Sequence, residues 1–469
     1  MRLFLLYLFF IPMVSLFAQQ GKPCDYNLLM KQGDQLYRTG DYRAALKKYN
    51  AARVCDPGKS PAVDDAIDKL FTAIEKQRDE AERLRRVAET EKKKAQAALL
   101  AVEEATVQIV QTLLRDASED ILYLRYEDAV NELHSAARLV QDKVPGSPLD
   151  QIRPDVGRAL MEPAFFYAET GKYPSAAAEL RLADSLINKG KISSWTTNIS
   201  DKDTTLLSRF RKTLSSLDST TYQSLRLRYY PDMVEVKGGT FWMGDENAGS
   251  DEKPEHPVTL SDFFIARTEV TFWQYNLYLE ATGIREVEDL GPLSWGIIGD
   301  NPVVNVSWGD TKMYTDWLNK QMGTQSYHLP TEAEWEYAAG GGSADRDSTS
   351  RRKYEYSGGD TLSVVGWHYE NSRNRTQPVG RKRPNGLGIY DMSGNVWEWC
   401  EDWYDDTYYQ TCFYEGIVLD PENTNFKSSR RVLRGGSWLG DANYCRASYR
   451  LRGNPDGRNN NVGFRVARD

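Results

Sequence analysis

The pattern of hydrophobic and polar positions divides the chain into a helical first half and a second half of a different kind. Over residues 29–57 small and apolar side chains recur at helical spacing, with Gly40-Asp41 in the middle and Pro57 at the end. This pattern predicts two antiparallel helices joined by a short turn. Weaker copies of the second-helix pattern follow at 126–136 and 171–183. Because one hairpin cannot bury its own apolar face, we expect several to stack.

The first hairpin, over residues 24–60, resembles a tetratricopeptide repeat, a helix-turn-helix unit of about 34 residues. The resemblance rests on Leu29, Gly33, Leu36, Ala45, Tyr49, Ala52 and Pro57. In such a hairpin the start of the first helix lies beside the end of the second. Cys24 and Cys55 occupy these two places, which makes them candidates for a disulfide in an exported protein.

A long charged helix is predicted next, over 62–144, running into a second hairpin. The chain has no Pro and no Gly from Asp64 to Val144, and 14 of the 20 residues from Glu75 to Lys94 are charged. Apolar positions are sparse at Ala81, Leu84 and Ala88 and return at Leu99, Val102, Ile109 and Leu113. Two interpretations stay open: a coiled-coil segment that oligomerises, or a solvated spacer helix.

Residues 145–230 are predicted to hold a third hairpin and, from Ser193 to Ser224, a Ser/Thr-rich connector with some helical pattern. At Pro231 the pattern changes to alternating positions typical of strands, over 233–236 and 239–244. Helical stretches follow from Glu269, over 311–322 and over 329–339. In the last stretch, Thr331 and Glu334 have the spacing of a capping box. Beyond Gly340 we expect mostly loops.

Composition sharpens this division. All but one of the 12 Trp and 27 of the 35 Gly fall after residue 230. Loops that lack regular structure need packed aromatic rings or bound metal in compensation. The net charge of -8 gives no reason to expect nucleic acid as a partner.

The first residues, 1–19, have the form of a signal peptide: Arg2, an apolar run from Leu3 to Phe17, and a small residue after it. We therefore expect an exported protein, in the periplasm, on the outer surface or secreted, in a bacterial envelope setting. No transmembrane span is expected after cleavage.

Residues 231–469 are similar to the formylglycine-generating enzyme (sulfatase-modifying factor) family. The resemblance implies an α+β domain, an elaborated C-type-lectin-like fold, preceded here by an all-α region. It rests on seven blocks in family order: 241–244, 252–258, 301–308, 329–339, 384–399, 434–438 and 461–465.

The resemblance also implies a structural calcium ion. Carried over to this sequence, the ligands are the side chains of Asp391 and Glu398 and the backbone carbonyls of Gly394 and Val396. Carboxylate and carbonyl oxygens on flexible loops suit a hard cation of this kind. By spacing alone, an exposed acidic turn explains the same residues.

Enzymes of the family oxidise a cysteine of a sulfatase to formylglycine, with copper(I) held by two cysteines five positions apart. Two thiolates suit this soft ion. Here the second position is Cys445 but the first is Gly440, so the resemblance predicts a broken copper site beside the retained Ser437. We expect that Cys400 and Cys412 pair with each other, or that one of them pairs with Cys445.

The leading hypothesis is therefore a non-catalytic binding or scaffold protein with protein partners. Its helical repeats dock one partner, and the surface from Trp438 to Asn461 recognises another. A solvated loop explains that surface equally well. The alternative is a formylglycine-generating oxidase that depends on copper and oxygen, with Cys445 and Ser437 as catalytic residues; an accessory subunit of such an enzyme is a third. His134, His256, His328 and His368 stand in no nucleophile motif. The single His134 of the first half argues against the family's iron-dependent branch.

Overall fold

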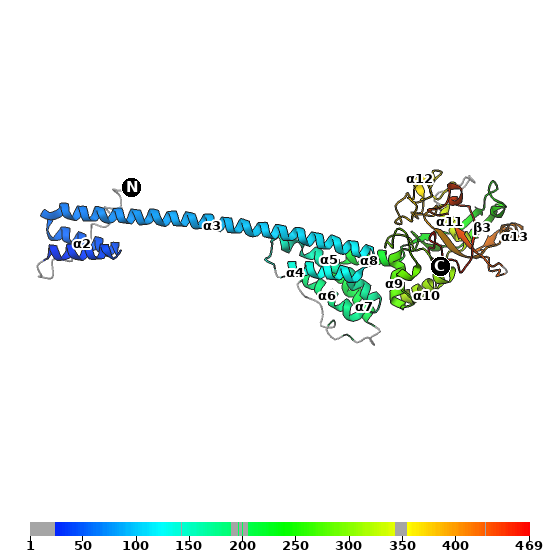
Figure 1. The fold of residues 1–469 in the computed structure, drawn as a ribbon, viewed down its shortest axis with the longest axis horizontal. Coiled ribbons are helices and arrows are strands. Elements are labelled where there is room, and N and C mark those ends of the chain that lie inside the picture. The colour runs from blue at the N-terminus through cyan, green and yellow to red at the C-terminus, as the bar shows by residue number, and fades with distance from the viewer. Residues whose placement is uncertain are drawn as a thin grey trace. The chain divides into compact units, whose positions relative to one another are not determined.

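A computed structural model describes residues 24–141, 143–188, 196, 199, 205–342, 354–426 and 428–469. The signal peptide predicted over 1–19 and part of the predicted connector lie outside these residues. The chain forms two compact units, up to Val102 and from Glu103 onward. Figure 1 shows the elements of each.

The first unit is a helical hairpin followed by the start of a long helix. Helix α1 (Tyr26–Arg38) and helix α2 (Tyr42–Cys55) are each started by an aspartate, Asp25 and Asp41, whose carboxylate accepts a backbone N–H. A Cβ atom at Gly33 would lie 2.5 Å from the Tyr49 ring, so the close approach of the helices requires glycine there. The predicted turn at Gly40 has a positive φ of 82°.

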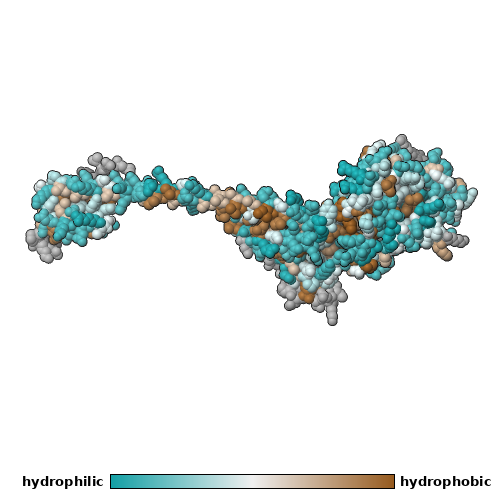
Figure 2. Space-filling model, in the orientation of Figure 1, coloured by the Kyte–Doolittle hydropathy of each residue, from teal (hydrophilic) through white to brown (hydrophobic). Residues whose placement is uncertain are grey.

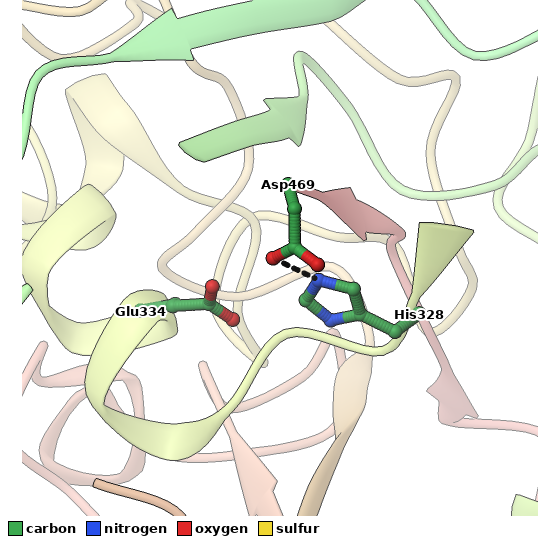
Figure 3. A group of neighbouring side chains, drawn as sticks. All are labelled: His328, Glu334 and Asp469. Atoms are coloured by element: carbon green, nitrogen blue, oxygen red, sulfur yellow. Dashed lines mark ion pairs between the residues drawn. The ribbon is translucent and has the colours of Figure 1, made fainter. Parts of the chain in front are cut away.

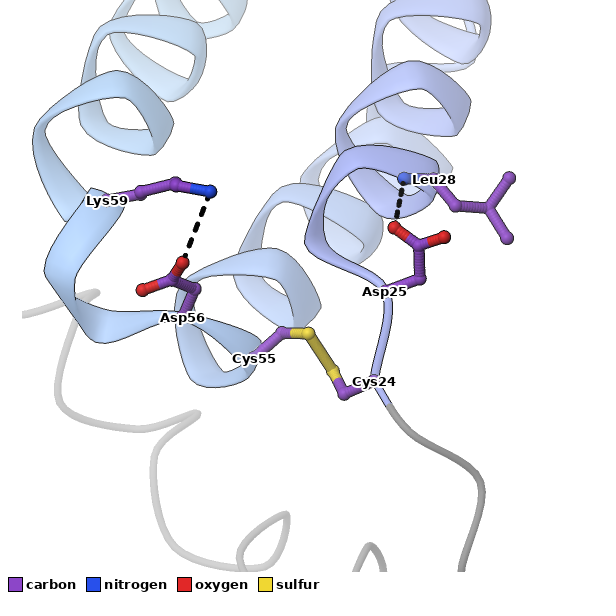
Figure 4. Close-up of a disulfide and its surroundings, with 6 residues drawn as sticks. All are labelled: Cys24, Asp25, Leu28, Cys55, Asp56 and Lys59. Carbon is purple, nitrogen blue, oxygen red and sulfur yellow. Dashed lines mark hydrogen bonds and ion pairs between the residues drawn. A yellow bond between two sulfur atoms is a disulfide. The ribbon is translucent and has the colours of Figure 1, made fainter.

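Cys24 and Cys55 form a disulfide across the open end of this hairpin, with their Cα atoms 5.6 Å apart (Figure 4). The bond joins the residue before α1 to the last residue of α2. It therefore holds the two helices together at the end opposite the Gly40 turn.

Helix α3 (Ser60–Leu122) follows a short 3₁₀ turn, η1 (Pro57–Lys59). Pro57–Leu122 is the one helix within the described ranges that is long and apolar enough to pass as a membrane span, with a window of mean hydropathy 1.3 that is 6% buried. The finding rests on length and composition alone, and the expectation of no membrane span stays a prediction. The apolar stretch that begins at Ala95 also contains Glu103 and Glu104, and carboxylates are costly in a bilayer. Figure 2 shows hydrophobic surface along part of this helix.

The second unit begins with stacked helices. The end of α3 and α4 (Tyr126–Val140) form one hairpin, and α5 (Pro148–Glu169) and α6 (Tyr173–Ile187) form the next. The predicted connector proves more ordered than expected, since α7 (Leu206–Leu217) and α8 (Ser219–Tyr229) pack on α5. Arg211 of α7 makes two hydrogen bonds, of 2.7 and 2.6 Å, to the buried carboxylate of Glu169.

The remainder of the unit holds three small sheets. One has the order β1 (Met233–Val236), β4 (Phe263–Ala266), β11 (Ala467–Arg468) and β5 (Tyr327–His328). The second has the order β10 (Val462–Gly463), β6 (Trp397–Trp403), β8 (Arg431–Arg434) and β9 (Leu451–Gly453), and the third β2 (Gly239–Met243), β3 (His256–Leu260) and β7 (Val418–Leu419). The last strand of the chain thus lies inside the first sheet.

Helices α9 (Phe272–Thr282), α10 (Trp308–Met322) and α11 (Glu332–Ala339) pack around these sheets, with the short α12 (Leu362–Val365) and α13 (Tyr408–Glu415). Thr271, Ser307 and Thr331 begin the first three through capping boxes. The prediction of a capping box at Thr331 and Glu334 is confirmed. An α+β domain after an all-α region is therefore the architecture that the structure shows.

The helices before residue 230 and the sheets after it share one hydrophobic core. The Tyr230 ring stacks on Trp317 of α10 with 6.3 Å between ring centroids, and its hydroxyl donates to Glu169 at 2.6 Å. The end of α3 is held as well, because the backbone N–H of Gly299 donates to the Leu122 carbonyl at 2.7 Å. From Glu103 onward, helices and sheets are one body.

Candidate functional site

The candidate site lies where the chain leaves strand β8. Gly435 and Gly436 have φ values of 96° and 76°, which places the turn in the left-handed region that favours glycine. A Cβ atom at Gly436 would lie 2.6 Å from the sulfur of Cys445. The short helix η5 (Ala442–Cys445) brings Cys445 beneath this turn.

Cys445 is completely buried in a small cluster with Tyr356, Leu362 and Val365. Its sulfur has one polar contact of note, to the Asp441 carbonyl at 3.8 Å. Burial raises the pKa of this thiol to about 12, although the backbone of Ser437 opposes the shift. Since the thiolate is the form that binds metal or attacks, burial disfavours the reactive form of Cys445.

Gly440, five residues before Cys445, has surroundings that leave room for a larger residue. A Cβ atom there would meet the Ser437 carbonyl at 3.5 Å and Tyr444 at 3.6 Å, which are ordinary contacts. The fold would therefore accept a cysteine at 440. The second copper-binding thiol that the family resemblance implies is absent because of the residue type at this position and not because of the backbone.

Ser437 is buried beside the two positions. Its hydroxyl accepts a hydrogen bond from the Asn461 side chain at 3.3 Å, and its carbonyl accepts one from the Gly440 N–H at 3.0 Å. These contacts hold the turn in place. No described base is within hydrogen-bonding distance to activate the hydroxyl as a nucleophile.

The expectation of a pair among Cys400, Cys412 and Cys445 is wrong, because all three are free and buried. Cys400, on β6, belongs to a core cluster with Trp335 and Tyr409, whereas Cys445 belongs to the separate cluster already described. Each therefore packs as a small apolar side chain.

Arginines of the predicted binding segment, from Trp438 to Asn461, form hydrogen bonds with carboxylates inside the domain. Arg450 is buried, with two hydrogen bonds of 2.7 and 2.8 Å to Glu332. Arg446 makes a similar pair with Glu252 at 2.9 and 2.8 Å. The exposed large apolar side chains around Gly440 are those of Tyr369, Leu439 and Tyr444, at 55%, 50% and 40% exposure.

Two of the predicted calcium ligands, the side chains of Asp391 and Glu398, interact in the core with Glu269 as an unpredicted neighbour, and Gly394 and Val396 are buried on the segment between them. One oxygen of Asp391 accepts the Gly380 N–H at 2.6 Å, and the other is buried without a hydrogen-bond partner. The same holds for Glu269, whose bonded oxygen accepts from Asn395 at 3.0 Å. The sequence pattern places Glu269 only at the start of a helical stretch. The one signal that could have identified it as a site residue is its position directly before the apolar Val270.

Glu398 differs from the other two because its carboxylate is already engaged. Arg465 donates to both of its oxygens at 2.6 and 2.7 Å, and the Trp335 indole donates to one at 2.7 Å. Burial and the neighbouring charges raise the pKa of Glu269, and burial raises that of Asp391 to about 6. Three buried carboxylates thus face one guanidinium.

The Sulfatase-modifying factor enzyme 1-like domain model matches residues 219–469, more than half of the sequence. The chain belongs to this family. The match begins at the start of α8, which is consistent with the packing of that helix onto the domain.

Relatives of this family domain carry different names. A formylglycine-generating enzyme of Streptomyces coelicolor is 34% identical over 50% of this chain and 88% of its own length. A protein from Paenibacillus barcinonensis named chaperone protein LppX is 32% identical over 50% of this chain and 89% of its own. A serine/threonine-protein kinase Pkn1 from Chlamydia trachomatis is 33% identical, with 51% of this chain matching 38% of that protein.

Proposed function

We propose that this chain is an exported scaffold protein whose family domain binds a protein partner without catalysis. The observation that carries the proposal is the pair of positions at the site: Gly440 has no side chain, and Cys445 is a buried thiol with a raised pKa. A copper(I) centre needs two thiolates, and the residues present do not fit that group.

The exposed side chains around Gly440 support binding. Tyr369, Leu439 and Tyr444 surround the glycine, and the Tyr369 N–H donates to the Gly440 carbonyl at 3.0 Å. Aromatic residues are enriched where proteins bind one another, because they present a large apolar area at low entropic cost. The relative named a chaperone protein is compatible with a binding role for such a domain.

The Cys24–Cys55 disulfide supports export. Disulfides persist in oxidising compartments and are rare in a reducing cytosol. This is the chemical context that a signal peptide over 1–19 would provide.

Copper(I) titration of the purified chain tests the proposal, followed by mass spectrometry of a Cys-x-Pro-x-Arg peptide after incubation in air. We expect no tight copper binding and no aldehyde product from the natural sequence. The matched variant is Gly440→Cys, which restores the second thiol in a space that accepts it; we expect this variant to gain copper(I) binding. Tight 1:1 copper binding and peptide oxidation by the natural sequence would establish the oxidase alternative instead.

We propose further that the buried carboxylates hold a structural calcium ion. Glu269, Asp391 and Glu398 share one buried guanidinium, that of Arg465, and the raised pKa values of Glu269 and Asp391 mean that the site without an ion disfavours their negative charges. A divalent cation would neutralise them, with the free oxygens of Glu269 and Asp391 as ligands and the Gly394 and Val396 carbonyls available to complete the site.

Thermal unfolding of the chelator-treated chain tests the calcium proposal. A bound ion stabilises by about 2.7 kcal/mol at 100 times its dissociation constant, so we expect a rise in Tm with calcium. Asp391→Asn should abolish the rise, whereas Glu370→Gln, at a carboxylate whose side chain is 84% exposed, should leave it unchanged. Equal behaviour of the Asp391→Asn variant and the natural chain would contradict the site.

A further inference from the structure

A second group of possible metal ligands lies at one edge of the first sheet, away from both sites above. His328 ends strand β5, Asp469 follows strand β11, and Glu334 lies in the first turn of α11. Strands β5 and β11 pair with Ala467 opposite His328. Figure 3 shows the three side chains directed toward one another from these elements.

The hydrogen bonds of His328 fix its tautomer. Its Nδ1 is 2.8 Å from the Leu329 carbonyl, which can only accept, so Nδ1 carries a proton. In the neutral ring Nε2 then has a free lone pair, and this atom is buried without a hydrogen-bond partner. A histidine that binds a metal through one nitrogen typically donates from the other to a carbonyl or carboxylate.

The distances fit an ion better than a direct hydrogen bond. Nε2 of His328 is 3.4 Å from Oδ1 of Asp469, beyond the 2.7–3.2 Å typical of N–H···O bonds. Two ligand atoms each about 2.1 Å from a tetrahedral ion lie about 3.4 Å apart. Glu334 supplies the third ligand, and the three ligand atoms all lie within 4.8 Å of one another.

The carboxylate of Glu334 is held in position by the capping box. The Thr331 N–H donates to its Oε2 at 2.8 Å, and the residue is 9% exposed. Burial raises the pKa of this carboxyl, and the charge of Asp469 adds to the shift. Asp469, with its side chain 82% exposed, is free to rotate onto an ion.

We propose that His328, Glu334 and Asp469 bind a divalent transition-metal ion of the zinc type. One imidazole and two carboxylates are a donor set that such ions accept, with a fourth position left for water. The ion would join the end of β5 and the start of α11, which are close in the sequence, to β11, the last strand of the chain. Its role is to secure the last strand within the sheet.

Metal titration of the full chain, after treatment with a chelator and its removal, tests the site. With zinc, we expect one ion bound per chain and a rise in Tm. With cobalt(II), we expect the weak visible absorption of nitrogen and oxygen ligands and no thiolate charge-transfer band, which separates this site from the free cysteines. Asp469→Asn changes a residue whose side chain is 82% exposed, and it should weaken binding by about tenfold or more.

His328→Gln should abolish binding, and His134→Gln is its matched control. His134 is paired with a single carboxylate, Glu179 at 2.8 Å, and no second described carboxylate completes a ligand group there. That variant should bind zinc as the natural chain does. Equal zinc affinity in the natural chain and the Asp469→Asn variant, no binding at all, or a cobalt–thiolate band would each overturn the proposal.

Discussion

At the scale of single residues, burial decides which chemical groups are active in this protein. Cys445 has the residue type of a metal ligand, yet its completely buried side chain has a raised pKa. Asp402 shows the same physics at a carboxyl group. It accepts the backbone N–H groups of Glu332 at 2.7 Å and Asn423 at 2.8 Å, and burial raises its pKa to about 7.

This shift gives Asp402 a predictable effect on stability. Between about pH 4 and pH 7 the folded chain keeps a proton on Asp402 that the unfolded chain has lost. The free energy of unfolding should therefore fall as the pH rises through this window, by up to about 4 kcal/mol from this group. Asp402→Asn cannot titrate, so its denaturant unfolding should lack that part of the pH dependence.

Denaturant unfolding at pH 4.5 and pH 7.5 measures the effect as the difference between the variant and the natural chain. Asp406→Asn, at an exposed aspartate close in the sequence, provides the control. If the natural chain and Asp402→Asn have the same pH dependence, Asp402 is ionised in the folded state throughout.

At the scale of elements, the sequence pattern predicted correctly the features that depend on residues close together in the chain. The turns at Gly40 and Gly171 and the capping box at Thr331 are short-range features, and the structure has them. The Ser/Thr-rich connector has some helical pattern in the sequence, but the packing of α7 and α8 on α5 is a tertiary contact that this pattern does not reveal. The burial of Arg450 was missed for a similar reason, since Glu332 lies 118 residues away in the sequence.

The candidate sites divide in the same way. The residues Gly440, Cys445, Asp391 and Glu398 could be chosen by resemblance to the family. Glu269 and Asp469 could not, because the first joins its partners only through tertiary contacts and the second through strand pairing. The sequence identifies residue types, whereas a set of metal ligands is recognised from the distances between their side chains.

Helix α3 gives a prediction at the same scale, because the coiled-coil interpretation stays a prediction. Val102 and Ile109, seven residues apart, are 63% and 54% exposed. An apolar stripe at this spacing is typical of a helix that pairs with another copy. We expect the chain to form a dimer in sedimentation, and Val102→Glu to weaken dimerisation by about tenfold or more, since a charge in the seam is costly.

Val87→Glu is the matched control for this experiment. Val87 is 51% exposed on the same helix but lies one position away from the heptad register of Val102. It should leave the association unchanged. A natural chain that sediments as a monomer would instead establish α3 as a spacer helix.

At the scale of the whole molecule, the family domain is not a separate body from the helices that directly precede it. Tyr230 links the two through Glu169 on one side and Trp317 on the other. Arg228 adds a cation–π contact, 4.5 Å from the centroid of the Trp273 ring. Residues from Glu103 onward should therefore unfold as one cooperative body.

Hydrogen exchange can test this coupling. Tyr230→Ala removes both contacts, and we expect faster exchange in α5 and α10 together, with a loss of about 3 kcal/mol or more in unfolding free energy. Tyr414→Ala, at a ring that is 79% exposed, should change neither helix. Faster exchange in α5 alone would mean that the helices and the sheets are energetically separate.

The open space beside Gly440 has an evolutionary consequence. Glycine and cysteine codons can differ by a single base, and the backbone at this position accepts a side chain without rearrangement. A lineage could therefore lose or regain the second thiol by one mutation, with no intermediate that fails to fold. In such a family, catalytic and binding members can be near neighbours in sequence space, and overall identity is a poor guide to which of the two a given gene encodes.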